Sequence, residues 1–150
     1  MVELTLTDFI LRLLAAMAAG TLVGIEREWR HKRAGLRTNA LVATGAAMFV
    51  LVALQLVTKM GSGDPTRVIG QVVTGIGFLG AGVILQQGSQ VHGLTTAATI
   101  WSSAAIGCLA AMGWWLETGA ATLAILLINI IMKPLENLIK RIGSPDPDQP

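Results

Sequence analysis

The sequence predicts an all-α integral membrane protein, a bundle of about five transmembrane helices. Hydrophobic residues make up 53% of the 150-residue chain and charged residues only 13%, whereas a soluble domain usually carries about 25% charged residues. No carboxylate lies between Asp64 and Glu117, and no Lys or Arg lies between Arg67 and Lys133. Because so few charges cannot cover a surface in water, lipid must be the solvent for much of the chain.

Five apolar stretches are the predicted spans. They run over Thr7 to Ile25, Asn39 to Val57, Val68 to Gln86, Thr95 to Trp114, and Gly119 to Met132. The first four approach the ~20 residues that a membrane helix requires. The fifth is the most apolar and reaches full length only when extended to Thr118 or toward Leu135. We expect a transmembrane helical domain over residues 1–141 and a disordered tail, rich in Pro and Asp, over residues 142–150.

Basic residues predict the orientation of the bundle. The connection between the first two stretches holds five of the eleven Lys and Arg residues, and a short basic loop stays in the cytoplasm. Five spans then place the amino terminus in the periplasm and the carboxyl terminus in the cytoplasm. Trp114 and Trp115 would lie at the outer interface and Trp29 at the inner one, as amphipathic rings prefer.

A glycine run in the third stretch resembles a dinucleotide-binding turn. Gly75, Gly77 and Gly80 have the G-x-G-x-x-G spacing. Such a turn needs a preceding strand, an amphipathic helix after it and an acidic residue about 20 positions later. The region near position 95 has no acid, and the segment after the glycines is apolar on all sides. We therefore expect neither a dinucleotide nor a nucleic acid as a partner.

Helix packing gives the glycines another role, because small residues let helices approach closely in lipid. The third helix has a stripe of small residues and a second glycine face, so we expect it to be central, with contacts on two sides. A kink or break between Gly75 and Gly82 that lines a substrate path is the alternative. The residues assigned to packing are Ala16, Gly20, Gly24, Gly70, Gly75, Gly77, Gly80, Ala81 and Gly82.

Polar residues at membrane depth are costly and mark functional positions by default. Asp8 precedes Arg12 by four residues, the favourable order for an ion pair on one helical face. The alternative is that the two charges only neutralise each other or snorkel outward. Asp64 before Pro65 predicts a helix N-cap. The group expected in the outer half of the bundle is Asp8, Arg12, Asp64, Arg67, Gln71, Thr74 and Glu117.

A second polar group is predicted at the cytoplasmic side. Its members end the first span, begin the second, or begin and continue the fourth, where Thr95 is expected to cap the helix. They are Glu26, Arg37, Thr38, Asn39, Thr95, Thr96, Thr99, Ser102 and Ser103. Hydroxyl groups in membrane helices often bond only to backbone or to a neighbouring helix, so a purely structural role is the alternative.

Several motifs resemble the MgtC/SapB family of bacterial inner-membrane proteins. They are G-x-E-R-E at 24–28, A-G-L-R-T-N-A-L-V at 34–42, D-P-x-R at 64–67, Q-V-V-T-G-I-G-F-L-G-A-G at 71–82 and G-L-T-T-A-A-T-I-W at 93–101. The resemblance covers about residues 8–135. It carries over the motif residues Glu26, Arg37, Thr38, Asn39, Asp64, Arg67, Gln71, Thr95, Thr96 and Trp101.

The resemblance implies a multi-pass inner-membrane protein associated with magnesium limitation and virulence. Members of the family are generally viewed as modulators of other membrane machinery, notably the proton-translocating ATP synthase. They typically append a small soluble domain after the last span, which we expect to be absent here.

We expect a non-enzymatic modulator, a homo-oligomer with a dimer favoured, that acts by helix–helix contact and needs no cofactor. The sequence offers no nucleophile–base set and no metal cluster. The alternative is a dimeric transporter or channel for a cation such as Mg²⁺, which takes oxygen ligands including one or two carboxylates. Asp8, Asp64 and Glu117 on the outer side and Glu26 on the inner side are the candidate ligands. An intramembrane enzyme would lack a base near its hydroxyls.

Overall fold

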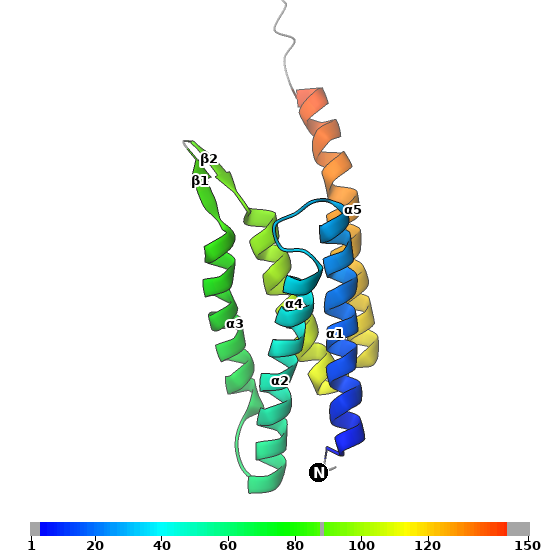
Figure 1. Cartoon of the computed structure of the whole chain (residues 1–150), viewed down its shortest axis with the longest axis vertical. Helices are drawn as coiled ribbons and strands as arrows, with labels where there is room; N and C mark the ends of the chain where they lie inside the picture. The colour runs from blue at the N-terminus through cyan, green and yellow to red at the C-terminus, as the bar shows by residue number, and fades with distance from the viewer. Residues whose placement is uncertain (1–3, 88, 144–150) are drawn as a thin grey trace, which may run out of the picture.

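The computed structural model describes residues 4–87 and 89–143 and shows five helices and one short hairpin (Figure 1). The helices are α1 Leu6–Trp29, α2 Leu36–Met60, α3 Pro65–Val83, α4 Leu94–Met112 and α5 Trp115–Gly143, and the strands are β1 Leu85–Gln87 and β2 Gln90–His92. All five helices are long and apolar enough to cross a membrane. This confirms the prediction of an all-α bundle of about five spans. The predicted tail lies outside the described residues from Ser144 onward.

Local sequence signals explain where the helices begin and end. Thr5 and Asp8 form a capping box at the start of α1, with Asp8 N donating to Thr5 Oγ1 at 3.1 Å. Asp64 caps α3, and Pro65 occupies the first helical position, where a missing N–H costs nothing. Gly61 ends α2 and Gly113 ends α4, both in the left-handed conformation that glycine adopts without strain.

Helices α1, α2 and α4 pack together as the core of the bundle. Helix α3 lies against α4 and α2 at one side, and α5 lies against α4 and α1 at the other (Figure 1). The expectation that α3 is central is therefore wrong for the single chain, and Gly80 is its one buried residue. Helix α3 is continuous through its glycines, so the alternative of a broken helix is not seen, and no strand precedes them from residue 4 onward.

The hairpin was not predicted. The third stretch was expected to continue to Gln86, but α3 ends at Val83 and the chain turns back as two antiparallel strands that pair Leu85 with His92. Gly93 then enters α4 with φ +93, and a Cβ there would collide with the backbone at Val83. We call the end of the bundle that carries this hairpin and the α1–α2 connection the hairpin end (Figure 1).

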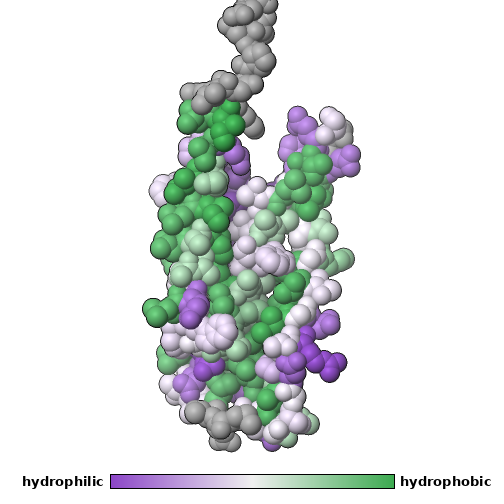
Figure 2. All heavy atoms as spheres, turned by 180° about the vertical axis from the view of Figure 1, so that it is seen from behind, coloured by the Kyte–Doolittle hydropathy of each residue, from purple (hydrophilic) through white to green (hydrophobic). Residues whose placement is uncertain are grey.

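The outer surface of the helices is apolar, as expected for a chain that contacts lipid. Phe78 and Leu116 expose more than four-fifths of their surface, a large cost in water and none in hydrocarbon. Figure 2 shows hydrophobic side chains along much of the bundle, with hydrophilic ones gathered near the hairpin tip and toward the opposite end.

Candidate functional site

Polar side chains from the three core helices are buried toward the hairpin end. We call them the buried polar cluster: Glu26, Arg27, Asn39, Thr96, Thr99 and Ser103. The contact between Gly20 and the backbone of Asn39 sets the level of α1 against α2. Arg27 lies seven residues after Gly20, and Thr96 lies seven residues before Ser103. Each step is about 10 Å along its helix toward the hairpin end. Arg27 and Thr96 therefore lie at a similar level.

Asn39 is the centre of a fully used hydrogen-bond set. Ser103 Oγ donates to Asn39 Oδ1 at 2.8 Å, which joins α4 to α2. Asn39 Nδ2 donates to the carbonyl oxygens of Ala34 at 3.0 Å and Gly35 at 2.9 Å. Because a buried amide left without partners is costly, this set fixes both the start of α2 and the register of α2 against α4.

Two charged side chains of α1 are almost completely buried. Arg27 is 2% exposed and Glu26 is 8% exposed. Arg30 Nε lies 2.8 Å from Glu26 Oε1 and forms an ion pair by distance, whereas Arg27 Nη1 lies 3.9 Å from Glu26 Oε2. Arg27 Nε and Nη2 have no hydrogen-bond partner among the residues that the structure describes. A buried guanidinium with unused donors is energetically expensive, so this position carries a cost that the fold must offset elsewhere.

The G-x-E-R-E motif forms the joint between α1 and α2. A Cβ on Gly24 would lie 2.5 Å from Leu36 Cα, so only glycine allows the two helices to meet there. Glu28 Oε2 accepts a hydrogen bond from Leu36 N at 3.2 Å and thereby caps α2. Within the motif, Glu26 and Arg27 turn inward and Glu28 closes the connection.

The expected Asp8–Arg12 ion pair is absent from the described residues. Asp8 is held in its capping box, where Thr5 Oγ1 donates to Asp8 Oδ2 at 2.6 Å. Arg12 Nη1 instead donates to the carbonyl oxygen of Ala111 at 2.8 Å. Arg12 therefore neutralises the carboxyl end of α4, where unpaired carbonyls carry partial negative charge.

Most of the other predicted outer residues are not brought together. Thr74 Oγ1 donates within α3 to Gly70 O, and Arg67, Gln71 and Glu117 are exposed. Asp64 accepts from Thr66 Oγ1 at 2.6 Å and from Thr66 N at 2.9 Å. These hydrogen bonds, the side-chain one first, hold the pKa of Asp64 below its ordinary value.

The predicted cytoplasmic residues divide into two sets. Glu26, Asn39, Thr96 and Thr99 belong to the buried polar cluster. Arg37, Thr38, Thr95 and Trp101 are exposed. Thr95 does not cap α4, because the N-cap is Gly93 and no side chain bonds there.

The small residues predicted to pack also divide. Gly20 and Gly24 lie in the α1–α2 contact, where a Cβ on Gly20 would lie 2.6 Å from Asn39 O, and Ala16 is fully buried in the core. On α3 only Gly80 meets a neighbour, Ala97. The other small residues of α3 that were predicted to pack have no neighbour at the Cβ position or are exposed in the single chain. They are Gly70, Gly75, Gly77, Ala81 and Gly82.

Sequence reasoning missed Arg27, Glu28 and Gly107. Arg27 was counted with the basic connection, although it follows Gly20 by seven residues and so shares its buried face. Glu28 is separated from its partner Leu36 by the α1–α2 connection, and the conformation of this connection could not be predicted from the sequence. Gly107 meets the backbone of Ala43 on α2, and its isolated position in an apolar stretch gave no signal.

The cluster offers hydrogen bonding rather than a prepared reaction centre. Ser103 donates to an amide oxygen and Thr99 donates to Thr95 O, so neither hydroxyl is bonded to a base. Within the described ranges there is no group of three His, Cys, Asp or Glu residues that could hold a metal ion. Glu26 is the one carboxylate of the cluster, and it lies beside two arginines.

Comparison with known proteins adds a family relationship. The sequence profile of the MgtC family matches residues 13–138. Protein MgtC of Salmonella typhimurium is 50% identical over 134 residues, which is 89% of this chain and 56% of that protein. An uncharacterized protein of Synechocystis sp. is 48% identical over 132 residues, 88% of this chain and 55% of that protein.

A third relative, Protein MgtC of Brucella abortus, is 48% identical over 128 residues, 85% of this chain and 52% of that protein. The chain thus spans a little over half the length of the curated relatives it matches. No solved structure matches it.

Proposed function

The chain belongs to the MgtC family, and on that premise we propose that it is an inner-membrane protein that modulates other membrane machinery and is not itself an enzyme or an ion carrier. The machinery we name is the proton-translocating ATP synthase, in bacteria adapting to low magnesium and to a host. This role follows the resemblance drawn from the motifs.

One observation supports contact with a partner helix more than any other. Gly70, Thr74, Gly77 and Ala81 recur on one face of α3, and all four are exposed. A Cβ on Gly70 or Gly77 would meet nothing within 4 Å. We call these four residues the outward stripe of α3. Small residues in lipid are useful where another helix comes close, and within the described chain no helix does so here.

The carboxylates argue against the transport alternative. Asp8 and Asp64 are helix caps. Glu26 lies beside Arg27 and Arg30. A Mg²⁺ path needs oxygen ligands that are free to exchange with water, and the buried guanidinium of Arg27, two of whose nitrogens lack hydrogen-bond partners in the described chain, repels a cation. A dimer that carries Mg²⁺ therefore remains the competing function, with less in its favour.

The test reconstitutes the chain in liposomes, alone and together with ATP synthase. Alone, the chain should move neither Mg²⁺ nor protons. Together, it should lower ATP-driven proton pumping, read by a pH-sensitive dye. Gly77→Leu should remove the inhibition without lowering the thermal unfolding temperature, whereas Gly82→Leu, on the same helix but off the outward stripe, should retain the inhibition. Mg²⁺ flux through the chain alone would establish the transport alternative instead.

A further inference from the structure

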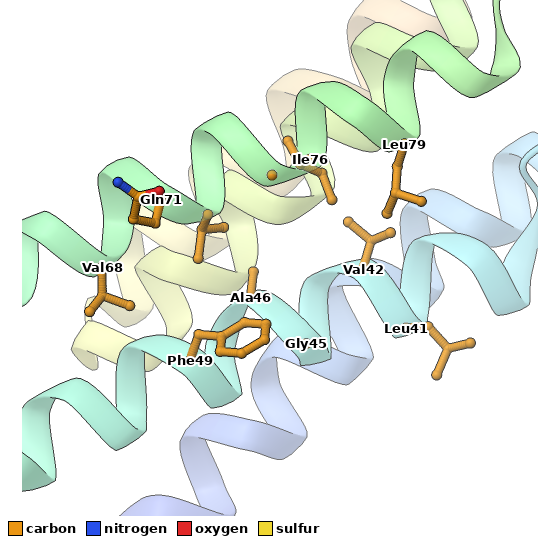
Figure 3. Close-up of a pocket in the computed structure, with 11 residues that line it drawn as sticks. Leu41, Val42, Gly45, Ala46, Phe49, Val68, Gln71, Ile76 and Leu79 are labelled. Atoms are coloured by element: carbon orange, nitrogen blue, oxygen red, sulfur yellow. The ribbon is translucent and has the colours of Figure 1, made fainter.

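An open groove of about 490 Å³ runs between α2 and α3 (Figure 3). Leu41 and Leu79 line the end toward the hairpin, and Val68 lines the opposite end. The lining is apolar except for Gln71, which lies near Val68. Because the groove opens to the lipid-facing surface, the surroundings of the chain must fill it.

The length of the groove matches one leaflet of a bilayer. The α3 wall runs from Val68 to Leu79, which is about 16 Å of helix. The α2 wall runs from Leu41 to Phe49, about 12 Å. Half of the hydrocarbon core of a bilayer is about 15 Å. A single acyl chain that enters from the hairpin end would therefore lie along the groove over its full depth.

Glycines keep the groove open from both sides. Gly45 of α2 and Gly75 of α3 line it, and a Cβ on either would meet nothing within 4 Å. Neither glycine is therefore required for close helix contact in the described chain, unlike Gly20. A large side chain at either position would occupy the groove itself and leave the helices where they are.

Unpaired polar groups lie at the hairpin end of the groove. Arg37 precedes Leu41 by four residues and Thr38 precedes Val42 by four, so each lies one turn beyond a lining residue on its side of α2. Both are exposed, and no hydrogen bond or ion pair joins either side chain to another residue in the described part of the chain. Glu28 already takes the Leu36 N–H, and Arg37 is the basic residue on α2 nearest to the lining residue Leu41, so its guanidinium is the group we assign to an anion.

We propose that the α2–α3 groove is a binding site for one anionic phospholipid. Its phosphate headgroup contacts Arg37 and Thr38, and one acyl chain lies between Gly45 and Gly75. Any lipid tail fills apolar space, but only an anionic headgroup compensates the free charge at this end. The site is independent of the function proposed above, because the outward stripe lies on the opposite face of α3.

Native mass spectrometry of the full chain tests the site. Purified in mild detergent, the wild type should retain one anionic phospholipid and should bind added phosphatidylglycerol in preference to phosphatidylcholine. Arg37→Gln should lower that preference about fivefold, which equals about 1 kcal/mol for one basic group at a membrane surface. Arg33→Gln, which removes an exposed charge from the same connection, should leave the preference unchanged.

The glycine variants separate the groove from the headgroup site. Gly75→Leu should lose bound lipid of either headgroup and unfold at or above the wild-type temperature. Gly119→Leu, which fills a different groove between α1 and α5, should retain the lipid. Equal wild-type affinity for the two headgroups, or full lipid retention by Gly75→Leu, overturns the proposal. So does a dimer that Gly75→Leu converts to monomer without loss of lipid, because the groove would then hold a second copy.

Discussion

A close helix contact in the core, between α1 and α2 at Gly20, gives the sharpest stability prediction. A Cβ on Gly20 would lie 2.6 Å from Asn39 O and 2.7 Å from Ala43 Cβ. Restoring an ordinary contact of 3.4 Å to the carbonyl oxygen requires a shift of 0.8 Å between the helices. Asn39 cannot yield easily, because its side chain is bonded to Ser103 and to the start of α2.

The magnitude follows from comparing Gly20→Ala with Gly77→Ala. Both changes gain the helix propensity of alanine, about 1 kcal/mol, so this gain cancels in the difference. Gly77 has nothing within 4 Å of its Cβ position, whereas Gly20 is overpacked by the new methyl group, which costs about 1–3 kcal/mol. Gly20→Ala should therefore be less stable than Gly77→Ala by about 1–3 kcal/mol.

The assay is reversible unfolding in mixed micelles of increasing SDS fraction, followed by far-UV circular dichroism. In an Ala43→Gly background, where the propensity cost of the new glycine cancels, Gly20→Ala should cost less than it does in the wild type but still destabilise, since the contact at 2.7 Å is removed and the one with Asn39 O at 2.6 Å remains. If Gly20→Ala and Gly77→Ala unfold at the same SDS fraction, the close approach of α1 and α2 is wrong.

Three further changes test the caps and the α4 terminus. Arg12→Leu removes the donor to Ala111 O and should destabilise the chain by about 1.5–3 kcal/mol in the same SDS titration, with Arg12→Lys in between. Glu28→Ala should cost about 1 kcal/mol by uncapping α2, while Glu28→Gln, which keeps an acceptor, should cost less. Because folding lowers the pKa of Asp64, its contribution is complete above the ordinary Asp pKa and is lost as pH falls through the lowered value. Wild type should therefore exceed Asp64→Ala in melting temperature at neutral pH, and the gap should close in strong acid.

Local sequence signals predicted the helices and several of their ends. The five spans follow from uninterrupted hydrophobicity, and the cap at Asp64 follows from an Asp–Pro pair whose geometry depends only on neighbours along the chain. The hairpin after Val83 was missed because Ile84 and Leu85 continue the apolar stretch past the end of α3. After β2 the chain enters α4 at Gly93, where φ is +93 and a Cβ would collide with the backbone at Val83, a tertiary contact that no local pattern indicates.

Tertiary placement is what the sequence left open. The small residues of α3 were interpreted as contacts with helices of the same chain. That interpretation failed because a stripe of small residues shows only that a helix can come close, and does not show which molecule supplies that helix. Arg12 was paired with Asp8 by spacing alone. In the structure Asp8 accepts a hydrogen bond from Thr5, and Arg12 donates one to Ala111 O at the end of α4. Arg27 was assigned to the basic connection between the first two spans. The rule that basic residues lie on the cytoplasmic side applies to a residue at the end of a span whether its side chain faces water or protein, so it could not show that Arg27 is buried.

The two kinds of glycine in this chain imply two kinds of consequence for the same substitution. Where the Cβ position meets backbone, as at Gly20, volume is added against a core that hydrogen bonds hold in place, so stability falls. Where it meets nothing, as at Gly75 and Gly77, the added side chain projects into the space that lipid or a partner would occupy, so binding falls and stability does not. A core held rigidly by Asn39 and Ser103 is what makes this separation measurable, because α3 can then lose its ligands without unfolding its neighbours.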